Sequence, residues 1–297
     1  MSETTSEITS MHARFLGRKS VQKVIADVIT HIVLVLLSVI LMIPFVWMVS
    51  TALKSIEQVF QYPPSWIPNP VQFENFWVGW THVSMTRYLL NTLHITVVAI
   101  VGVVASSSLV AYGFARLRAP GKEILFLLLL STLMLPEQVT LIPNFLLFKW
   151  LGWLNTYKPL LVPAFTGVPF FVFLLRQFYM TIPFDLDDAA RIDGCGRIDV
   201  YWRIMLPLSK PAIATVAIFV FFNRWNSFLW PLIYLRSPEK YTLAVGLSFF
   251  HSAQSGGLTY WNWLMAVTVL VAIPPLVVFF LAQRYFVQGI AMTGIKG

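Results

Sequence analysis

The sequence predicts an all-α integral membrane protein with six transmembrane helices. Its 297 residues are 57% hydrophobic and only 11% charged, whereas soluble domains carry about 25% charged residues. The mean hydropathy is +0.72. Six apolar runs are each long enough to cross a hydrocarbon layer of about 30 Å. These observations exclude an ordinary soluble domain.

The expected spans follow one another along the whole chain. Basic residues precede the first run, as in a secretory signal, but the run is too long and lacks a small-residue cleavage site, so we expect an uncleaved span. An even number of crossings places both termini on the same side of the membrane. The spans cover residues 32–53, 92–114, 124–142, 160–180, 212–234 and 264–286.

The distribution of basic residues predicts the orientation. Of the 21 Lys and Arg residues, 14 lie on the side of the termini, six lie on the other side, and Arg224 lies inside the fifth span. Because basic residues favour the cytoplasmic side, we expect a cytoplasmic segment 1–27, a membrane domain 28–290 and a cytoplasmic tail 291–297. The net charge of +8 then reflects topology and anionic membrane lipid rather than nucleic-acid binding.

A polar loop, residues 183–211, separates the fourth and fifth spans. Its segment 185–211 holds five acidic and four basic residues. A charged insert of this length at a membrane surface favours a docking element for a soluble partner. The alternative is an amphipathic hairpin on lipid headgroups, which would have a basic face. The acidic start of the segment favours docking.

Local chemistry predicts two helices with a break between them. Pro183 ends the preceding span, and three aspartates supply a cap and first-turn acids. Gly194 and Gly196 interrupt the first helix. A second amphipathic segment, 198–205, is expected to stop at Pro207. The lone Cys195 is interpreted as a small residue in the break.

Several motifs resemble those of one known family. Several residues resemble the cytoplasmic "EAA loop" of bacterial ABC importer permeases: Asp188-Ala189-Ala190, Asp193-Gly194, Ile204, Leu206-Pro207 and Pro211. Asp188 stands where that family usually has Glu. AYGFARLRAPGK (111–122), TLMLPEQVTLIPNF (132–145), WNSFLWPL (225–232) and the tail QGIAMTGIKG (288–297) resemble the carbohydrate-importer branch. This branch includes the second permeases of maltose and glycerol-3-phosphate systems.

The resemblance implies a type I ABC importer permease fold without catalytic activity. The implied partners are a second permease, two ATP-binding subunits and an extracytoplasmic solute-binding protein, in the bacterial inner membrane. The chain lacks a Gly-rich phosphate cradle ending in Gly-Lys-Ser/Thr, so we expect ATP and Mg on the partners and no cofactor or metal here. The residues implied in ATPase coupling are Asp188, Ala189, Ala190, Asp193, Gly194, Leu206 and Pro207.

Polar residues inside the spans predict a solute pathway. Glu137 in the third span and Arg224 in the fifth can share one depth, and an unpaired intramembrane charge is expensive. Prolines in and beside several spans fit an irregular, water-lined path. A static polar clamp between helices is about as well supported as direct contact with a sugar. The pathway candidates are Glu137, Gln138, Asn223, Arg224, Trp225 and Asn226.

Two classes of transporter remain. One is a pore subunit of an ATP-driven sugar importer, and the other is an ion-coupled secondary sugar carrier in which Glu137 and Arg224 form a relay. Secondary carriers often contain internal repeats with interrupted segments in both halves, and the sequence shows no convincing repeat. The charged loop also has no evident task in a carrier. The sequence therefore favours the importer.

Overall fold

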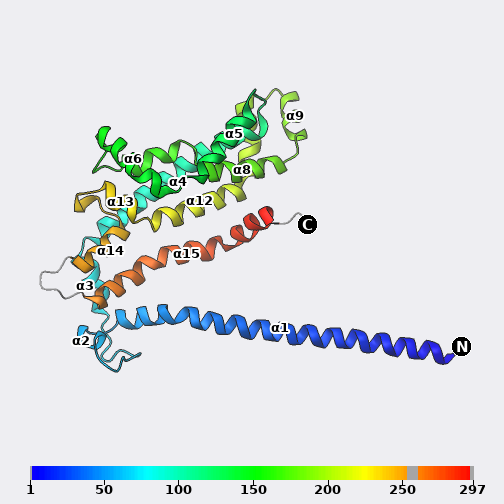
Figure 1. Ribbon diagram of the computed structural model, residues 1–297, viewed down its shortest axis with the longest axis horizontal. Helices are drawn as coiled ribbons and strands as arrows, with labels where there is room; N and C mark the ends of the chain where they lie inside the picture. Colours follow the sequence, from blue (N-terminus) through cyan, green and yellow to red (C-terminus); the bar gives the residue numbers. More distant parts are fainter. Residues whose placement is uncertain (1, 253–259, 295–297) are drawn as a thin grey trace.

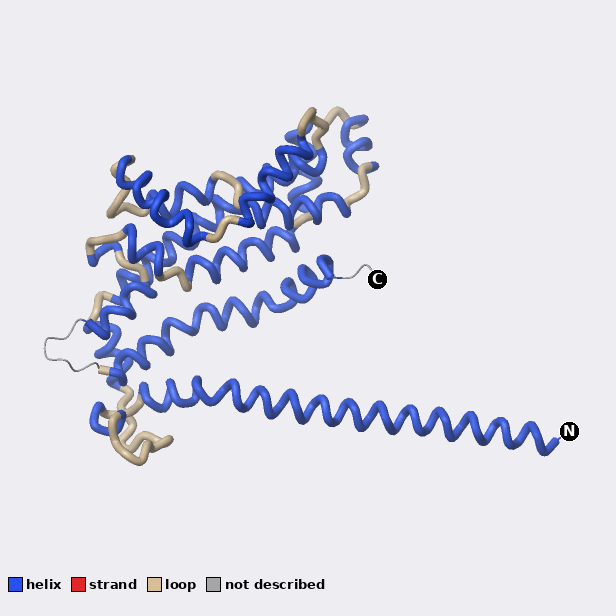
Figure 2. The backbone as a smooth tube through the Cα atoms, in the orientation of Figure 1, coloured by secondary structure: helices blue, strands red, loops and turns tan. Residues whose placement is uncertain are grey.

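A computed structural model of the chain describes residues 2–252 and 260–294. Within these ranges every regular element is a helix (Figure 2). Four helices are long and apolar enough to cross a membrane, and two bent helix pairs raise the number to six if each pair forms one span. The predicted all-α class is confirmed.

The helices divide into long spans and short connecting pieces. In the first half of the chain they are α1 (Ser2–Ala52), α2 (Ile56–Val59), α3 (Glu74–His82), α4 (Met85–Arg116), α5 (Lys122–Ser131), η1 (Thr132–Met134) and α6 (Glu137–Trp150). In the second half they are α7 (Lys158–Leu161), η2 (Val162–Phe165), α8 (Pro169–Thr181), α9 (Asp185–Ile192), α10 (Arg197–Val200), η3 (Tyr201–Met205), α11 (Leu206–Leu208), α12 (Lys210–Trp225), α13 (Leu229–Tyr234), η4 (Pro238–Lys240), α14 (Leu243–Ser252) and α15 (Trp261–Gly294).

The core is built around α4, which packs against α8 and α12 (Figure 1). Small side chains on α4, such as Ala99 and Ala111, are fully buried at these contacts. Small residues let helix backbones approach closely, which is how membrane helices gain packing contacts. A Cβ atom on Gly102 of the same helix would lie 2.8 Å from the Phe165 ring. This face of α4 therefore holds the neighbouring segments at close range.

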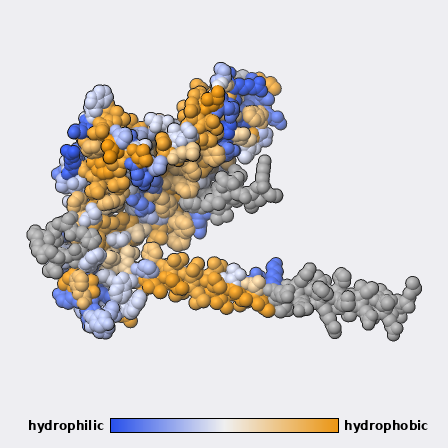
Figure 3. Space-filling view, in the orientation of Figure 1, coloured by the Kyte–Doolittle hydropathy of each residue, from blue (hydrophilic) through white to orange (hydrophobic). Residues whose placement is uncertain are grey.

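The helix α1 lies apart from this core, and its C-terminal end contacts α15. Its large apolar side chains in residues 24–46 are all more than 40% exposed. Figure 3 shows the resulting apolar surface along α1. Such a surface fits a hydrocarbon environment rather than water.

The third span differs from the single straight helix 124–142 that we expected. Its two parts, residues 122–134 and 137–150, meet at an angle of 99°. Pro136 lies between them in an extended conformation, with φ −61° and ψ 138°. Proline disfavours helical geometry in the residue before it, and Leu135 is also extended. The bend places Glu137 in the first turn of a new helix.

The fifth span is also interrupted. We expected one helix over 212–234, but α12 ends at Trp225 and α13 begins at Leu229. Asn226 closes α12, and its side-chain amide donates to the Phe222 carbonyl at 3.0 Å. By contrast, Pro274 and Pro275 lie inside α15 without ending it. Pro136 lies at the 99° bend of the third span, whereas Pro169 begins α8 after the extended residue Val168.

Different elements lie at the two ends of the molecule. The start of α1, the end of α15 and α9 lie toward one end, and α3 and α14 lie toward the other (Figure 1). The helix α1 passes through the expected boundary at residue 27, and α15 continues past residue 290 to Gly294. The rest of the expected tail, residues 295–297, lies outside the described residues.

Asn155 joins two loops at the end that carries α14. It adopts a positive φ of 59°. Its Oδ1 accepts from the backbone N–H groups of Arg236 at 3.1 Å and Ser237 at 3.0 Å, and its Nδ2 donates to the Ser237 hydroxyl at 2.7 Å. The Lys240 ammonium donates to the Asn155 carbonyl at 2.6 Å. One side chain therefore fixes the path of residues 236–240.

Replacing Asn155 with alanine should destabilise the protein. Three lost hydrogen bonds, at about 1 kcal/mol each, and a left-handed backbone that costs alanine another ~1–2 kcal/mol give a loss of about 4 kcal/mol. Asn155→Gly keeps the backbone conformation and should lose only the hydrogen-bond share. Thermal unfolding of both purified variants in detergent measures the difference, and equal losses would contradict a backbone contribution.

Candidate functional site

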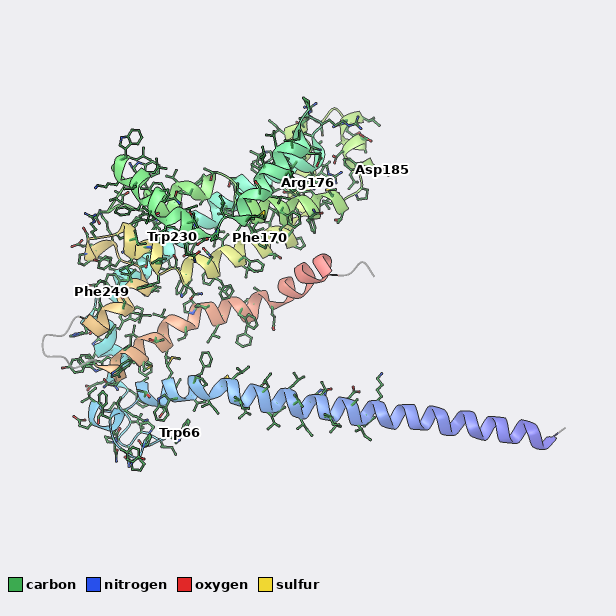
Figure 4. The ribbon with its side chains drawn as sticks, in the orientation of Figure 1. Trp66, Phe170, Arg176, Asp185, Trp230 and Phe249 are labelled. Atoms are coloured by element: carbon green, nitrogen blue, oxygen red, sulfur yellow. The ribbon has the colours of Figure 1, made fainter. Side chains whose placement is uncertain are left out.

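The first candidate site is the loop that carries α9. The predicted first helix is confirmed, but its aspartate cap is wrong, because Phe184 occupies the cap position and no side chain caps the helix. All three aspartates lie in the first turn instead, where they face the positive end of the helix dipole. Figure 4 shows Asp185 at the end of the molecule, far from Trp230.

The two faces of α9 have opposite roles. Asp187 and Ala190 face the core and are each 5% exposed. Leu186, Ala189 and Ile192 face outward, and Ile192 is 87% exposed. Of the predicted docking residues, Asp188, Ala189, Asp193 and Gly194 are therefore on the free surface, whereas Ala190 packs inward.

The break after α9 is a helix-ending motif with a defined geometry. Gly194 has a φ of 83°. Its N–H donates to the Arg191 carbonyl at 3.0 Å, and the Cys195 N–H donates to the Ala190 carbonyl at 2.9 Å. These two bonds form a Schellman motif, which requires the left-handed conformation at the glycine. A Cβ at Gly194 would meet nothing within 4 Å, so the requirement is conformational rather than steric.

The second helix of the loop continues beyond the predicted stop at Pro207. The helical run extends from Arg197 to Leu208, with a π-helical turn over Tyr201–Met205. Proline lacks an N–H and clashes with the carbonyl four residues earlier in an α-helix, and here a π-helical turn directly precedes the short helix that holds Pro207. The chain then bends by 76° between Leu208 and Lys210. Leu206 packs against the core and Pro207 is exposed.

The second candidate site is a cavity of about 1000 Å³ between α6, α8 and α12. Polar side chains and aromatic rings share its wall, including Phe170 and Trp230, which Figure 4 labels. Its polar lining residues are Glu137, Thr140, Asn144, Asn223, Arg224, Asn226 and Ser227. Its aromatic lining residues are Phe148, Phe170, Phe171, Phe219, Phe222, Phe228, Trp230 and Tyr234.

The structure brings four of the six predicted pathway residues together. Glu137, Asn223, Arg224 and Asn226 line the cavity, whereas Gln138 and Trp225 do not. Trp225 is 2% exposed, and its indole N–H donates to the Val271 carbonyl at 3.3 Å. Its ring stacks on Phe221 at a centroid distance of 5.4 Å. Trp225 is therefore part of the contact between α12 and α15.

Glu137, in the first turn of α6, and Arg224, in the last turn of α12, both line the cavity. They form no ion pair within 4.0 Å, however, among the ion pairs of the described side chains. Both charges face the same cavity. The cavity is therefore bordered by one charge of each sign.

Sequence reasoning missed two groups of residues. Thr140 and Asn144 line the cavity one and two turns after Glu137, and their spacing on α6 could have indicated a shared face. The second group is the buried contact of Arg116 with Asp187, whose Nη1 and Oδ2 atoms are 3.6 Å apart. No local pattern connects these two positions in the sequence.

The helical fold, the cavity and the charged loop define a polytopic membrane permease. The chain belongs to the family described as "Binding-protein-dependent transport system inner membrane component", whose family model matches residues 102–292. This membership decides between the two predicted classes in favour of the importer permease.

Similarity to known proteins extends over most of the chain. It is 35% identical over 259 residues to the probable ABC transporter permease protein YurM of Bacillus subtilis, covering 86% of this chain and 83% of that protein. It is 36% identical over 271 residues to the sn-glycerol-3-phosphate transport system permease protein UgpE of Yersinia pestis, covering 89% of this chain and 95% of that protein.

The same fold occurs in a solved structure. A chain of a bacterial ABC transporter involved in the import of the acidic polysaccharide alginate superposes with a TM-score of 0.80 at 23% identity. The match covers 88% of this chain and 96% of that chain. The predicted importer-permease fold is confirmed.

Proposed function

We propose that this permease subunit moves a sugar or sugar-like solute through the cavity, driven by ATPase subunits that bind α9. The observation that carries the proposal is the mixed wall of the cavity, where aromatic rings lie beside amides, hydroxyls and one charge of each sign. Sugar rings stack on aromatic side chains through their apolar faces, and their hydroxyls need donors and acceptors. The UgpE relative is named as a permease protein of an sn-glycerol-3-phosphate transport system.

The coupling part of the proposal rests on the exposed face of α9. Leu186, Ala189 and Ile192 present apolar surface at the end of the molecule, and Asp188 and Asp193 flank it. Apolar surface bordered by polar residues is typical of protein contacts. One of two ATPase subunits, which would hold ATP and Mg, would receive this face. Gly194 would shape it by ending the helix.

The remaining partners follow from the family. A homologous second permease would complete the pathway, and an extracytoplasmic solute-binding protein would deliver the solute. The excess of basic residues on the side of the termini supports a cytoplasmic position for α9 and both chain ends. In this orientation the permease lies in the bacterial inner membrane, and α3 and α14 face the extracytoplasmic binding protein.

The solute class is tested with the complete transporter in proteoliposomes. A panel of mono-, di- and oligosaccharides is first screened by thermal shift of the cognate solute-binding protein. At least one sugar should then stimulate ATP hydrolysis and be taken up. If every sugar in the panel fails and a non-sugar solute succeeds, the proposed solute class is wrong.

The cavity is tested with the sugar that the panel identifies. Asn223→Ala, on the cavity wall, should raise KM for uptake roughly tenfold, because one lost hydrogen bond is worth about 1–2 kcal/mol. Gln138→Ala removes a similar amide outside the cavity and should leave KM unchanged. Equal effects of the two variants would contradict the assignment of this cavity to the solute.

A further inference from the structure

Arg116, the last residue of α4, joins three segments through one buried side chain. The side chain has no exposed surface. Its Nη2 donates to the carbonyls of Tyr179 at 2.8 Å and Ile182 at 2.6 Å. Tyr179 lies in the last turn of α8, and Ile182 is the C-cap residue that follows the helix. The Tyr179 carbonyl also accepts from the Ile182 N–H at 3.3 Å, and carbonyls at a helix C-terminus lack the regular intrahelical partner. Arg116, on α4, therefore donates hydrogen bonds to carbonyl groups at the C-terminal end of α8.

The same guanidinium also reaches the start of α9. Its Nη1 lies 3.6 Å from the Asp187 carboxylate, and its central carbon lies 4.2 Å from the centre of the Phe184 ring. Asp187 is on the inward face of α9, and Phe184 precedes its first turn. A single cation thus contacts both sides of the short linker between α8 and α9.

Two further residues on this face of α4 hold the rest of the loop. Tyr112, one turn before Arg116, donates its hydroxyl to the Arg197 carbonyl at 2.8 Å, at the start of α10. Ser108, one turn earlier, shares a hydrogen bond of 2.7 Å with the Tyr201 hydroxyl. Residues four apart lie on one helix face. The loop is therefore attached to α4 at three successive turns.

The attachment by Arg116 is not saturated. Among the described atoms, Arg116 Nε and Nη1 and Asp187 Oδ1 are buried without a hydrogen-bond partner. These groups lie at the contact between α4 and α9 and could pair more closely if α9 moved toward α4.

We infer that Arg116 is a positioning residue that fastens α9 to the ends of α4 and α8, so that movement of α9 moves the membrane helices. This inference rests on the proposed role of α9 as the ATPase contact. Leu186 and Ile192 would receive the force on the outer face, and Asp187 would pass it to Arg116 on the inner face. The helices α4 and α8 both line or border the cavity, so their ends are suitable points to change it.

The first measurement asks whether Arg116 holds the loop in place. Cys195 is the only cysteine of the chain and is partly buried beside the core. Its modification by maleimide in the purified transporter reports local opening of the loop. Arg116→Gln and Asp187→Asn each leave one buried charge unpaired, so the modification rate should rise at least about tenfold. Arg116→Lys keeps the charge and should give a smaller rise.

Asp185→Asn is the matched control for this measurement. It also removes an acid from the first turn of α9, but Asp185 is exposed and takes part in none of the ion pairs of the described side chains. Its rate should equal that of the native protein. Unchanged rates in both Arg116→Gln and Asp187→Asn would overturn the attachment. Asp187→Asn is nearly isosteric, so it keeps the test valid if Arg116→Gln does not accumulate in the membrane.

The second measurement asks whether the attachment carries movement. In a Cys195→Ser background, Ser227→Cys places a thiol on the cavity wall. In the native transporter its maleimide reactivity should change when ATP and vanadate trap the ATPase. Arg116→Gln or Asp187→Asn should remove this change while ATP hydrolysis continues. A fully retained change in both variants would overturn the inference.

A Gly194→Trp variant in the same assay separates this inference from the proposed function beneath it. If Gly194→Trp removes the response of Ser227→Cys and Arg116→Gln does not, α9 is the coupling element and Arg116 is not its link. If Gly194→Trp also leaves the response intact, α9 does not couple ATP hydrolysis to the cavity, and the proposed function is wrong. Loss of the response in both variants supports both.

Discussion

Replacing Gly194 with tryptophan is expected to abolish ATP-driven uptake while the protein still accumulates in the membrane. The residue has a φ of 83°, and a non-glycine residue held there costs about 1–2 kcal/mol. This strain would be relieved by opening the Schellman motif that closes α9. The indole would in addition project from the surface on which we propose that the ATPase binds. Uptake and membrane abundance are measured in parallel.

Two smaller substitutions separate strain from obstruction. Gly194→Asn should retain most uptake, because asparagine tolerates the left-handed conformation. Gly194→Ala adds only a methyl group, for which there is open space within 4 Å, so its effect reports backbone strain. We expect the loss of uptake to increase from Gly194→Asn to Gly194→Ala and then to Gly194→Trp. Normal uptake by the tryptophan variant would refute a role of this break in coupling.

Much of the fold could be predicted because membrane helices carry a strong local signal. Length and hydropathy predicted six apolar runs, and four of them correspond to single helices long and apolar enough to cross a membrane. The glycine break in the polar loop was predicted because only glycine readily adopts the conformation that ends α9. The rule that proline ends a helix failed at Pro207. Its effect depends on the preceding turn, which is π-helical here, and one proline does not reveal whether such a turn will form.

The candidate sites were less predictable because they depend on helix orientation and on distant contacts. Asn223, Arg224, Trp225 and Asn226 are consecutive polar or amphipathic residues, but each turns by about 100° from the last. Trp225 therefore faces α15 while its neighbours face the cavity. The contact between Arg116 and Asp187 arises only after α4, α8 and α9 are assembled.

Charge neutralisation of Glu137 and Arg224 is expected to show in a double-mutant cycle. Each charge alone beside a low-dielectric wall is unfavourable, so Glu137→Gln and Arg224→Gln should each lower membrane abundance or uptake. The double variant should recover part of the loss. Since no direct ion pair within 4.0 Å joins these two side chains, we expect a coupling energy of only about 1 kcal/mol. Abundance and uptake per molecule are scored separately.

The two readouts distinguish a structural clamp from a solute contact. A clamp predicts that the double variant recovers abundance and transports normally, whereas a solute contact predicts recovered abundance with altered uptake. The control pair is Glu123 and Arg176, which lie outside the cavity. Their Oε2 and Nη2 atoms are 3.5 Å apart, and the Glu123 side chain is 71% exposed. Neutralising that pair should leave uptake per molecule unchanged, because neither side chain lines the cavity. Strictly additive losses at Glu137 and Arg224 in both readouts would show that the two charges act independently, and Arg224 would then face the solute or the second permease alone.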